Sequence, residues 1–252
     1  MLIVSKKRHG VNIIDCWYAK QPIKEKGIVR YMEAGFPDTG SNQEQFRTLL
    51  TDLTESEEEI IGKYTKNCRY EVRRAPKEGI SCEFYVGQEL LKENRIEEFV
   101  DFFEKFWNSK GIDFTERQKC QDEITEYAKH NAFAISIAKD EAEKLVYHTY
   151  IVDENWVRLY QSASQFRSDN MELQKKIGFA NRYLHKEDMM FFKQQGKVCY
   201  DWGGAGLNEE VASITHFKES FGGKEAIFYN GQTANGAAGK AYEKTVSILN
   251  KF

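Results

Sequence analysis

The sequence predicts an α/β protein with a mixed sheet, and three observations carry this prediction. Phenylalanines recur at helical spacing between Glu97 and Ser109, and Gly111 follows them, which indicates an amphipathic helix. Apolar and polar residues then alternate in three short segments, typical of an antiparallel meander: Phe133–Ile137, Leu145–Val152 and Trp156–Ser162. From Glu97 onward, the expected order is two helices, three strands, a helix, a strand, a helix and a strand.

The other elements of this second half are bounded by caps and chain breakers. A helix with a weaker apolar side is expected at about Glu116–His130. Gly196 is expected to cap the next helix, the first of the elements named below. The remaining elements are expected in this order: a helix at Leu184–Gln195, a strand at Val198–Asp201, a helix ending at Phe221, a strand at Ala226–Asn230, and a loop over 231–244 that leads into a terminal helix.

The first 96 residues predict a smaller lobe. Apolar and polar residues alternate over Val11–Phe36 around a central break, which predicts a β-hairpin. A short strand and a helix are expected next, because Thr54 and Glu57 match a capping box and Pro76 and Gly79 stop the helix. We therefore expect two parts: an N-terminal lobe over residues 1–96 and a larger domain over residues 97–252.

Composition excludes several classes of protein. The net charge of -3 gives no global attraction to nucleic acid, so any contact with tRNA would need a local basic patch. Five cysteines without metal-ligand spacing predict free thiols, no disulfide frame and no metal. No apolar run approaches the roughly 20 residues needed to cross a bilayer, and the N-terminus turns basic after four residues. We expect a cytoplasmic protein without a membrane span.

Three separated segments carry a resemblance to a known family. They are DLTESEEEIIGKYTKNCRYEVRRAPKEG at 52–79, ANRYLHKEDMMFFKQQGKVCYDWGG at 180–204 and HFKESFGG at 216–223. In this order they resemble the FemABX peptidyltransferase branch of the GNAT acyltransferase superfamily. The resemblance implies a GNAT-like acyltransferase fold with a partial N-terminal lobe, in which a helix between the fourth and fifth strands carries the acyl donor beside two splayed strands.

The same resemblance implies a function. It indicates transfer of an acyl or aminoacyl group to an amine of a cell-wall, capsule or glycan, or small-metabolite acceptor, which could be nucleotide-linked. The donor would be an aminoacyl-tRNA or an acyl-coenzyme A used as a cosubstrate, with no tightly bound cofactor. Two alternatives remain open: an acetyl-coenzyme A-dependent N-acetyltransferase, and a binding module of the same fold without catalysis.

Acyl transfer needs an unprotonated nucleophile and donors for the developing oxyanion, and three residues are candidates for these roles. Lys218 lies in the segment that closes the transfer site in resembling proteins, where its charge would stabilise an oxyanion; a solvated helix lysine is the alternative. Asp201 ends a strand beside glycines, where it would orient the acceptor or only bond the turn. His185 completes the catalytic candidates.

Further candidates would bind substrate or donor. We predict a loop at Ala180–His185 that lacks the glycines of a coenzyme A pyrophosphate turn, so that donor recognition would rest on side chains. A basic stretch with arginines near i, i+4 and i+5 spacing suits phosphates, or is an ordinary solvated helix face. The candidates are Asn181, Arg182, Phe217, Trp202, Arg69, Arg73, Arg74, Tyr160 and His148.

Overall fold

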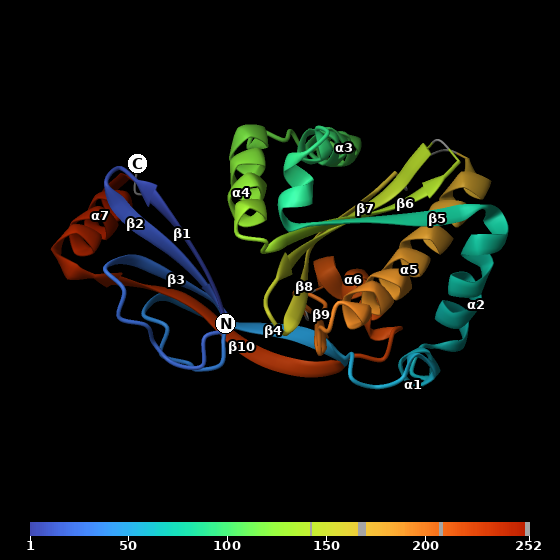
Figure 1. The fold of residues 1–252 in the computed structure, drawn as a ribbon, viewed down its shortest axis with the longest axis horizontal. Helices are drawn as coiled ribbons and strands as arrows, with labels where there is room; N and C mark the ends of the chain where they lie inside the picture. The colour runs from blue at the N-terminus through green and yellow to red at the C-terminus, as the bar shows by residue number, and fades with distance from the viewer. Residues whose placement is uncertain (142, 166–169, 207–208, 250–252) are drawn as a thin grey trace. The chain divides into compact units, whose positions relative to one another are not determined.

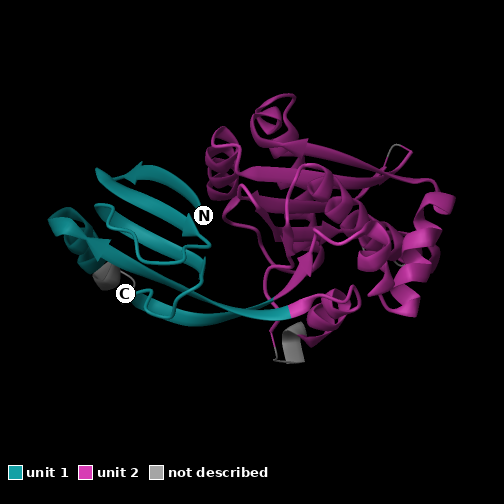
Figure 2. Ribbon diagram, turned by 60° about the horizontal axis from the view of Figure 1, so that its bottom comes forward, with its two compact units in different colours: residues 1–48, 225–252 teal, residues 49–224 magenta. Residues whose placement is uncertain are grey.

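The computed structural model describes residues 1–141, 143–165, 170–206 and 209–249, and these form two compact units. One unit joins Met1–Thr48 to Glu225–Phe252, and the other is Leu49–Lys224 (Figure 2). This division differs from the predicted boundary after residue 96. The reason is β10 (Lys224–Asn235), which pairs with β3 (Gly27–Ala34) and so returns the end of the chain to its beginning.

The smaller unit contains a strand direction that the sequence did not predict. Strands β1 (Leu2–Arg8) and β2 (Val11–Trp17) form an antiparallel hairpin, but β2 and β3 are parallel. The predicted hairpin over Val11–Phe36 is therefore wrong. Residues 18–26 carry the chain back before β3 begins, so that Ile13 lies opposite Ile28. Alternation of apolar and polar residues marks a strand but does not give its direction.

The larger unit holds the helices and strands that build the site. Its elements are β4 (Ser41–Asp52, shared with the smaller unit), α1 (Glu57–Gly62), α2 (Lys66–Arg74), β5 (Ile80–Val86), α3 (Arg95–Ser109), α4 (Arg117–Lys129), β6 (Phe133–Asp140), β7 (Glu143–Val152), β8 (Trp156–Ser164), α5 (Met171–Gln194), β9 (Cys199–Asp201) and α6 (Glu209–Glu219). Short 3-10 helices at Ala75–Glu78 and Gly87–Leu91 flank β5, and α7 (Gly236–Leu249) ends the smaller unit.

The described strands form one mixed sheet of ten strands, as the fold class predicts. Hydrogen bonds order them β1-β2-β3-β10-β4-β9-β8-β7-β6-β5. Strands β5 to β8 form the antiparallel meander with its preceding strand, and Figure 1 shows α3 and α4 on one side of these strands and α2 and α5 on the other. Strand β8 pairs in parallel with β9 through Trp156, Val157 and Arg158, so its remaining residues run on without β9 beside them.

Two helix starts differ from the prediction. The capping box is formed by Ser56 and Glu59, because Thr54 bonds the Asp52 carboxylate through its N–H and hydroxyl at 2.8 and 2.6 Å. Helix α5 begins 13 residues earlier than expected, at Met171, where the Asn170 side chain accepts from two backbone N–H groups. Residues 180–185 are therefore helical, and the prediction of a loop there is wrong.

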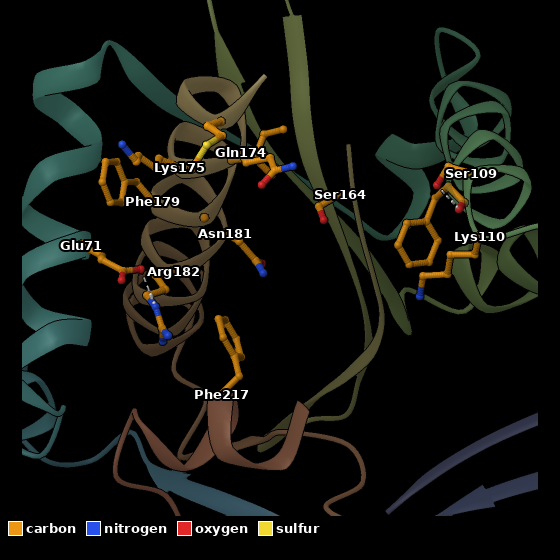
Figure 3. A pocket seen from close by; sticks show the side chains of 14 residues that line it. Glu71, Ser109, Lys110, Ser164, Gln174, Lys175, Phe179, Asn181, Arg182 and Phe217 are labelled. Atoms are coloured by element: carbon orange, nitrogen blue, oxygen red, sulfur yellow. Dashed lines mark hydrogen bonds and ion pairs between the residues drawn. The ribbon is translucent and has the colours of Figure 1, made fainter. Parts of the chain in front are cut away.

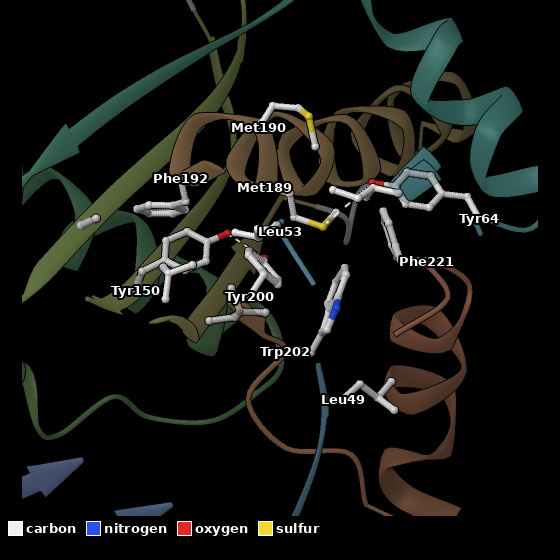
Figure 4. Packing of buried hydrophobic residues seen from close by; sticks show 14 of the residues in the cluster. Leu49, Leu53, Tyr64, Tyr150, Met189, Met190, Phe192, Tyr200, Trp202 and Phe221 are labelled. Carbon is white, nitrogen blue, oxygen red and sulfur yellow. Dashed lines mark hydrogen bonds between the residues drawn. The ribbon is translucent and has the colours of Figure 1, made fainter. Parts of the chain in front are cut away.

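A large aromatic core lies under the C-terminal half of α5 (Figure 4). Met189 and Phe192 project into it from the helix, and the hydroxyl of Tyr64 contacts the Met189 sulfur at 3.9 Å. Trp202 is fully buried and donates from its indole N–H to the Thr51 hydroxyl at 3.0 Å. None of the helices within the described ranges combines the length and apolar character needed to cross a membrane.

Candidate active site

A cavity of about 630 Å³ opens along the N-terminal half of α5, beside the end of β8 (Figure 3). Its volume is in the range of small-molecule sites. Gly178 lines it, and a Cβ added there would meet no atom within 4 Å, so the helix leaves open space on this side. The lining residues are Glu71, Phe106, Ser109, Lys110, Ser164, Met171, Gln174, Lys175, Ile177, Gly178, Phe179, Asn181, Arg182 and Phe217.

Arg182 is fixed in the cavity wall by three neighbours. Its guanidinium donates to a Glu71 carboxylate oxygen at 2.7 Å and to the Ser220 hydroxyl at 2.7 Å. It also lies 4.5 Å from the centre of the Phe217 ring, a cation–π contact. Lysines 110 and 175 add two cations to the lining against one carboxylate, that of Glu71. The lining therefore favours a ligand that carries negative charge.

A buried hydrogen-bond chain leads from the core to the cavity through His148. One ring nitrogen, Nδ1, lies 2.8 Å from an Asp188 carboxylate oxygen, and the other, Nε2, lies 2.8 Å from the Asn181 amide oxygen. The Tyr150 hydroxyl donates to the same Asp188 oxygen at 2.5 Å. His148 and Asp188 are fully buried, whereas Asn181 lines the cavity. The chain thus joins β7 to two turns of α5.

His185 lies beside this chain but does not line the cavity. Its ring stacks on that of His148 with 4.0 Å between centroids, and its Nδ1 lies 3.0 Å from the Tyr200 hydroxyl. Burial, and then the nearby His148, lowers the pKa of His185 well below its ordinary value. The imidazole is therefore neutral near pH 7. Burial also raises the pKa of both Tyr150 and Tyr200, so their hydroxyls stay protonated and donate.

The side chains of His148, His185 and Asp188 are of metal-ligand type, with ligand atoms within 4.8 Å of one another. Hydrogen bonds engage four of their possible ligand atoms, namely Nδ1 and Nε2 of His148, Oδ2 of Asp188 and Nδ1 of His185, whereas Oδ1 of Asp188 has no partner among the described residues. The two imidazole rings are also stacked at 27° rather than turned edge-on to a common point. We describe the group as a hydrogen-bond network.

The predicted catalytic pair, Asp201 at the end of β9 and Lys218 on α6, contacts the turn that follows β9. The Lys218 ammonium donates to the Gly203 and Gly204 carbonyls at 2.7 Å each, and this residue is 8% exposed. The Asp201 carboxylate accepts from the Gly203 N–H at 2.8 Å. Gly203 has φ of +60°, and a Cβ there would lie 2.1 Å from the Leu159 carbonyl oxygen. These contacts hold the turn, and Lys218, Asp201 and Trp202 are absent from the cavity lining.

The remaining candidates lie outside the cavity. Arg69 donates to the Gly62 and Tyr64 carbonyls and so caps α1, whereas Arg73 is exposed on α2. Arg74 pairs with Glu78 at 2.6 Å and lines a smaller neighbouring cavity of about 260 Å³. The Tyr160 hydroxyl lies 3.4 Å from a Glu123 carboxylate oxygen, and burial raises its pKa.

Sequence reasoning identified part of this site. It named Asn181, Arg182 and Phe217, which line the cavity, and His148, which contacts one of them. It did not single out Asp188. A signal was present, because positions 181, 185 and 188 are polar and lie at helical spacing, on one face of a helix.

Comparison with known proteins rests on structure. No family model matches the chain, and no curated protein matches its sequence. Similar solved structures include the C-terminal DUF2156 domain of an Agrobacterium fabrum protein assigned as a lysylphosphatidylglycerol synthetase (TM-score 0.54, 12% identity, 98% of this chain and 85% of that chain), FemX (0.54, 13%, 79% and 63%) and L-PGS from Bacillus licheniformis (0.53, 13%, 88% and 72%).

These likenesses define the class of fold. The chain has a GNAT-like acyltransferase fold, with FemX and L-PGS among its structural neighbours. At 12–13% identity the comparison concerns the fold alone.

Proposed function

We propose that this protein is an acyltransferase that moves an acyl or aminoacyl group from a carrier to an amine of a cell-envelope, glycan or small-metabolite acceptor. The observation that carries the proposal is the cavity where β8 runs on beyond its pairing with β9, along the N-terminal half of α5. The likeness to FemX and to the two synthetase structures supports it at the level of fold.

The cationic lining supports a donor that carries phosphate. Lys110, Lys175 and Arg182 lie around the cavity, and acyl-coenzyme A and aminoacyl-tRNA both carry phosphates that cations can bind. With residues 180–185 inside a helix, the missing glycines there no longer argue against coenzyme A. Both donor classes therefore belong to the proposal, as does a cytoplasmic location, where both are made.

The reaction joins the acceptor nitrogen to the acyl carbon. As the C–N bond forms, the carbonyl π electrons move to oxygen; they return when the bond to the carrier's oxygen or sulfur breaks. The carrier leaves as an alcohol or thiol, and the proton lost by the amine balances the leaving group. The protein has to hold donor and acceptor together and stabilise the transient oxyanion.

Filling the cavity at Gly178 tests this proposal. Acetyl-coenzyme A and a mixture of radiolabelled aminoacyl-tRNAs would be offered as donors with a panel of amines, and product would be separated and counted. Gly178→Leu projects a side chain into open space, so it is expected to abolish transfer while the fold survives. Gly178→Ala is the matched control; it retains activity and adds about 0.5–1 kcal/mol of stability, because alanine favours a helix over glycine.

Two results would contradict the proposal. Transfer unchanged in Gly178→Leu would place the reaction elsewhere. Donor binding by the wild type, seen as a rise in Tm, without turnover against any amine would favour a binding module of the same fold.

A further inference from the structure

We propose that the side-chain amide of Asn181 donates a hydrogen bond to the carbonyl oxygen of the acyl group, and that His148 and Asp188 are positioning residues that turn the amide toward it. This inference rests on the proposed acyl transfer and assigns it a catalytic donor. It concerns the place where the buried hydrogen-bond chain described above reaches the cavity.

The first step is the position of the amide. Asn181 lines the cavity, and Figure 3 shows its side chain extending from α5 into the cavity with nitrogen at its tip. Its oxygen is engaged with His148 at 2.8 Å. Its nitrogen, Nδ2, has no hydrogen-bond partner among the described residues. An amide nitrogen carries two hydrogens, so this leaves donors for a ligand.

The second step decides which amide atom faces the cavity. The Asp188 carboxylate is fully buried, and its Oδ1 has no partner within the described part of the chain. Two donors, from Tyr150 and His148, reach only its other oxygen. An ionised carboxylate this deeply buried is stabilised by an opposite charge beside it. His148 contacts Asp188 directly and can carry that charge, so we take it as an imidazolium in this proposal.

The third step follows from an imidazolium at position 148. Both of its nitrogens then donate, Nδ1–H to Asp188 and Nε2–H to the partner on α5. That partner must be the amide oxygen of Asn181. The orientation of the amide is therefore set from inside the core, and its two N–H bonds remain for the cavity.

The chemistry of the donor is electrostatic. When the amine attacks, charge gathers on the carbonyl oxygen, and a fixed N–H at hydrogen-bond distance stabilises that charge without itself gaining or losing a proton. Removing one such donor lowers kcat by about 10²- to 10³-fold in enzymes with an oxyanion hole. Asn181 can serve this role without moving, because the His148 contact holds it in place.

The orientation can be tested without any substrate. The full chain would be labelled with ¹⁵N at its five histidines, and long-range ¹H–¹⁵N spectra would report the protonation of each ring nitrogen. His148→Gln identifies the signal by its loss. Two protonated nitrogens at position 148 are expected. A neutral ring with hydrogen only on Nδ1 would overturn the proposal, because the amide N–H would then point to His148 and the oxygen to the cavity.

Kinetics test the role itself, with whichever donor the transfer assay identifies. Asn181→Ala and Asn181→Asp are expected to lower kcat about 10²-fold or more with little change in KM for the donor, whereas the exposed Gln118→Ala leaves both unchanged. An unchanged kcat in Asn181→Ala would overturn the proposal. Absence of turnover in the wild type would instead count against acyl transfer, and the spectra would still decide the orientation.

A double variant separates positioning from general structural damage. Asp188→Asn alone is expected to lower kcat, but it should add little further loss in the Asn181→Ala background, since it acts through that amide. Circular dichroism would verify that each variant is folded. Additive losses from the two changes would show that Asp188 does not act through Asn181.

Discussion

The two halves of α5 differ in their surroundings: the first half borders the cavity and the second half is buried in the aromatic core. In the first half, Met171 is 69% exposed and Gly178 faces open space along the cavity. In the second half, Met189 and Phe192 are buried in the aromatic core. The comparison teaches that the first half packs on the sheet with one side, through Ile177 and Ala180, and faces the cavity with another, whereas the second half is enclosed by the core. The polar positions 181, 185 and 188 lie between the part of α5 that borders the cavity and the part that is buried in the core.

The largest expected difference between the halves is in stability. Met189→Ala removes a fully buried side chain and leaves a cavity in the core, so the free energy of unfolding should fall by about 2–5 kcal/mol. Met171→Ala is the matched control in the exposed half, with a change within about 0.5 kcal/mol. Urea unfolding measures both. Equal effects of the two substitutions would show that the halves are not packed differently.

A smaller effect is expected at the boundary, from the pair of Arg182 and Glu71. Their side chains are only 16% and 19% exposed, so a double-mutant cycle with Arg182→Met and Glu71→Gln should give a coupling of about 0.5–3 kcal/mol. The more exposed pair Arg74 and Glu78 serves as the control, with a coupling of at most about 0.5 kcal/mol. If the coupling energy of Arg182 with Glu71 is no larger than that of Arg74 with Glu78, Arg182 is not held in the cavity wall by this ion pair.

The smallest expected effect is a pH dependence from His185. Its folded-state pKa lies well below the value of about 6.5 that it has when unfolded, so below that pH the unfolded chain binds a proton that the folded chain does not. Stability should therefore fall as pH decreases from 7 to 5, by up to about 1.4 kcal/mol per unit from this residue.

His185→Gln should flatten this dependence, whereas the exposed Gln118→Ala, which removes no titratable group, should leave it unchanged. The free energy of unfolding would be measured by urea titration at several values of pH. A slope that is the same in the wild type and in His185→Gln would mean that the imidazole is not held neutral by the fold.

The parts of the fold that the sequence predicted are those with a strong local period. Helix α3 repeats phenylalanine on one face, and strands β6 to β8 are apolar-rich segments separated by short polar turns, so both were predicted close to their observed bounds. The first turns of α5 escaped prediction because they are mostly polar and expose one side to the cavity. The direction of β3 also escaped it, because direction is set by pairing between distant residues.

The site divides in the same way. Arg182, Phe217 and Asn181 could be named because they stand in short motifs. Glu71 and Asp188 depend on contacts between α2, β7 and α5, which residues far apart in the chain supply. Lys218 was predicted to face the ligand, but its ammonium group donates to two backbone carbonyls. The sequence alone does not distinguish these two environments of a lysine.

The turn after β9 shows why a shared sequence motif can reflect the stability of a turn and need not reflect a shared substrate. At Gly203 the backbone of β8 leaves room for a hydrogen atom only, and the carboxylate of Asp201 and the ammonium of Lys218 tie down the same few peptide groups. Selection for a stable turn alone would preserve this aspartate, glycine and lysine through long divergence. Two proteins that share the motif therefore share this turn, and they can still act on entirely different substrates.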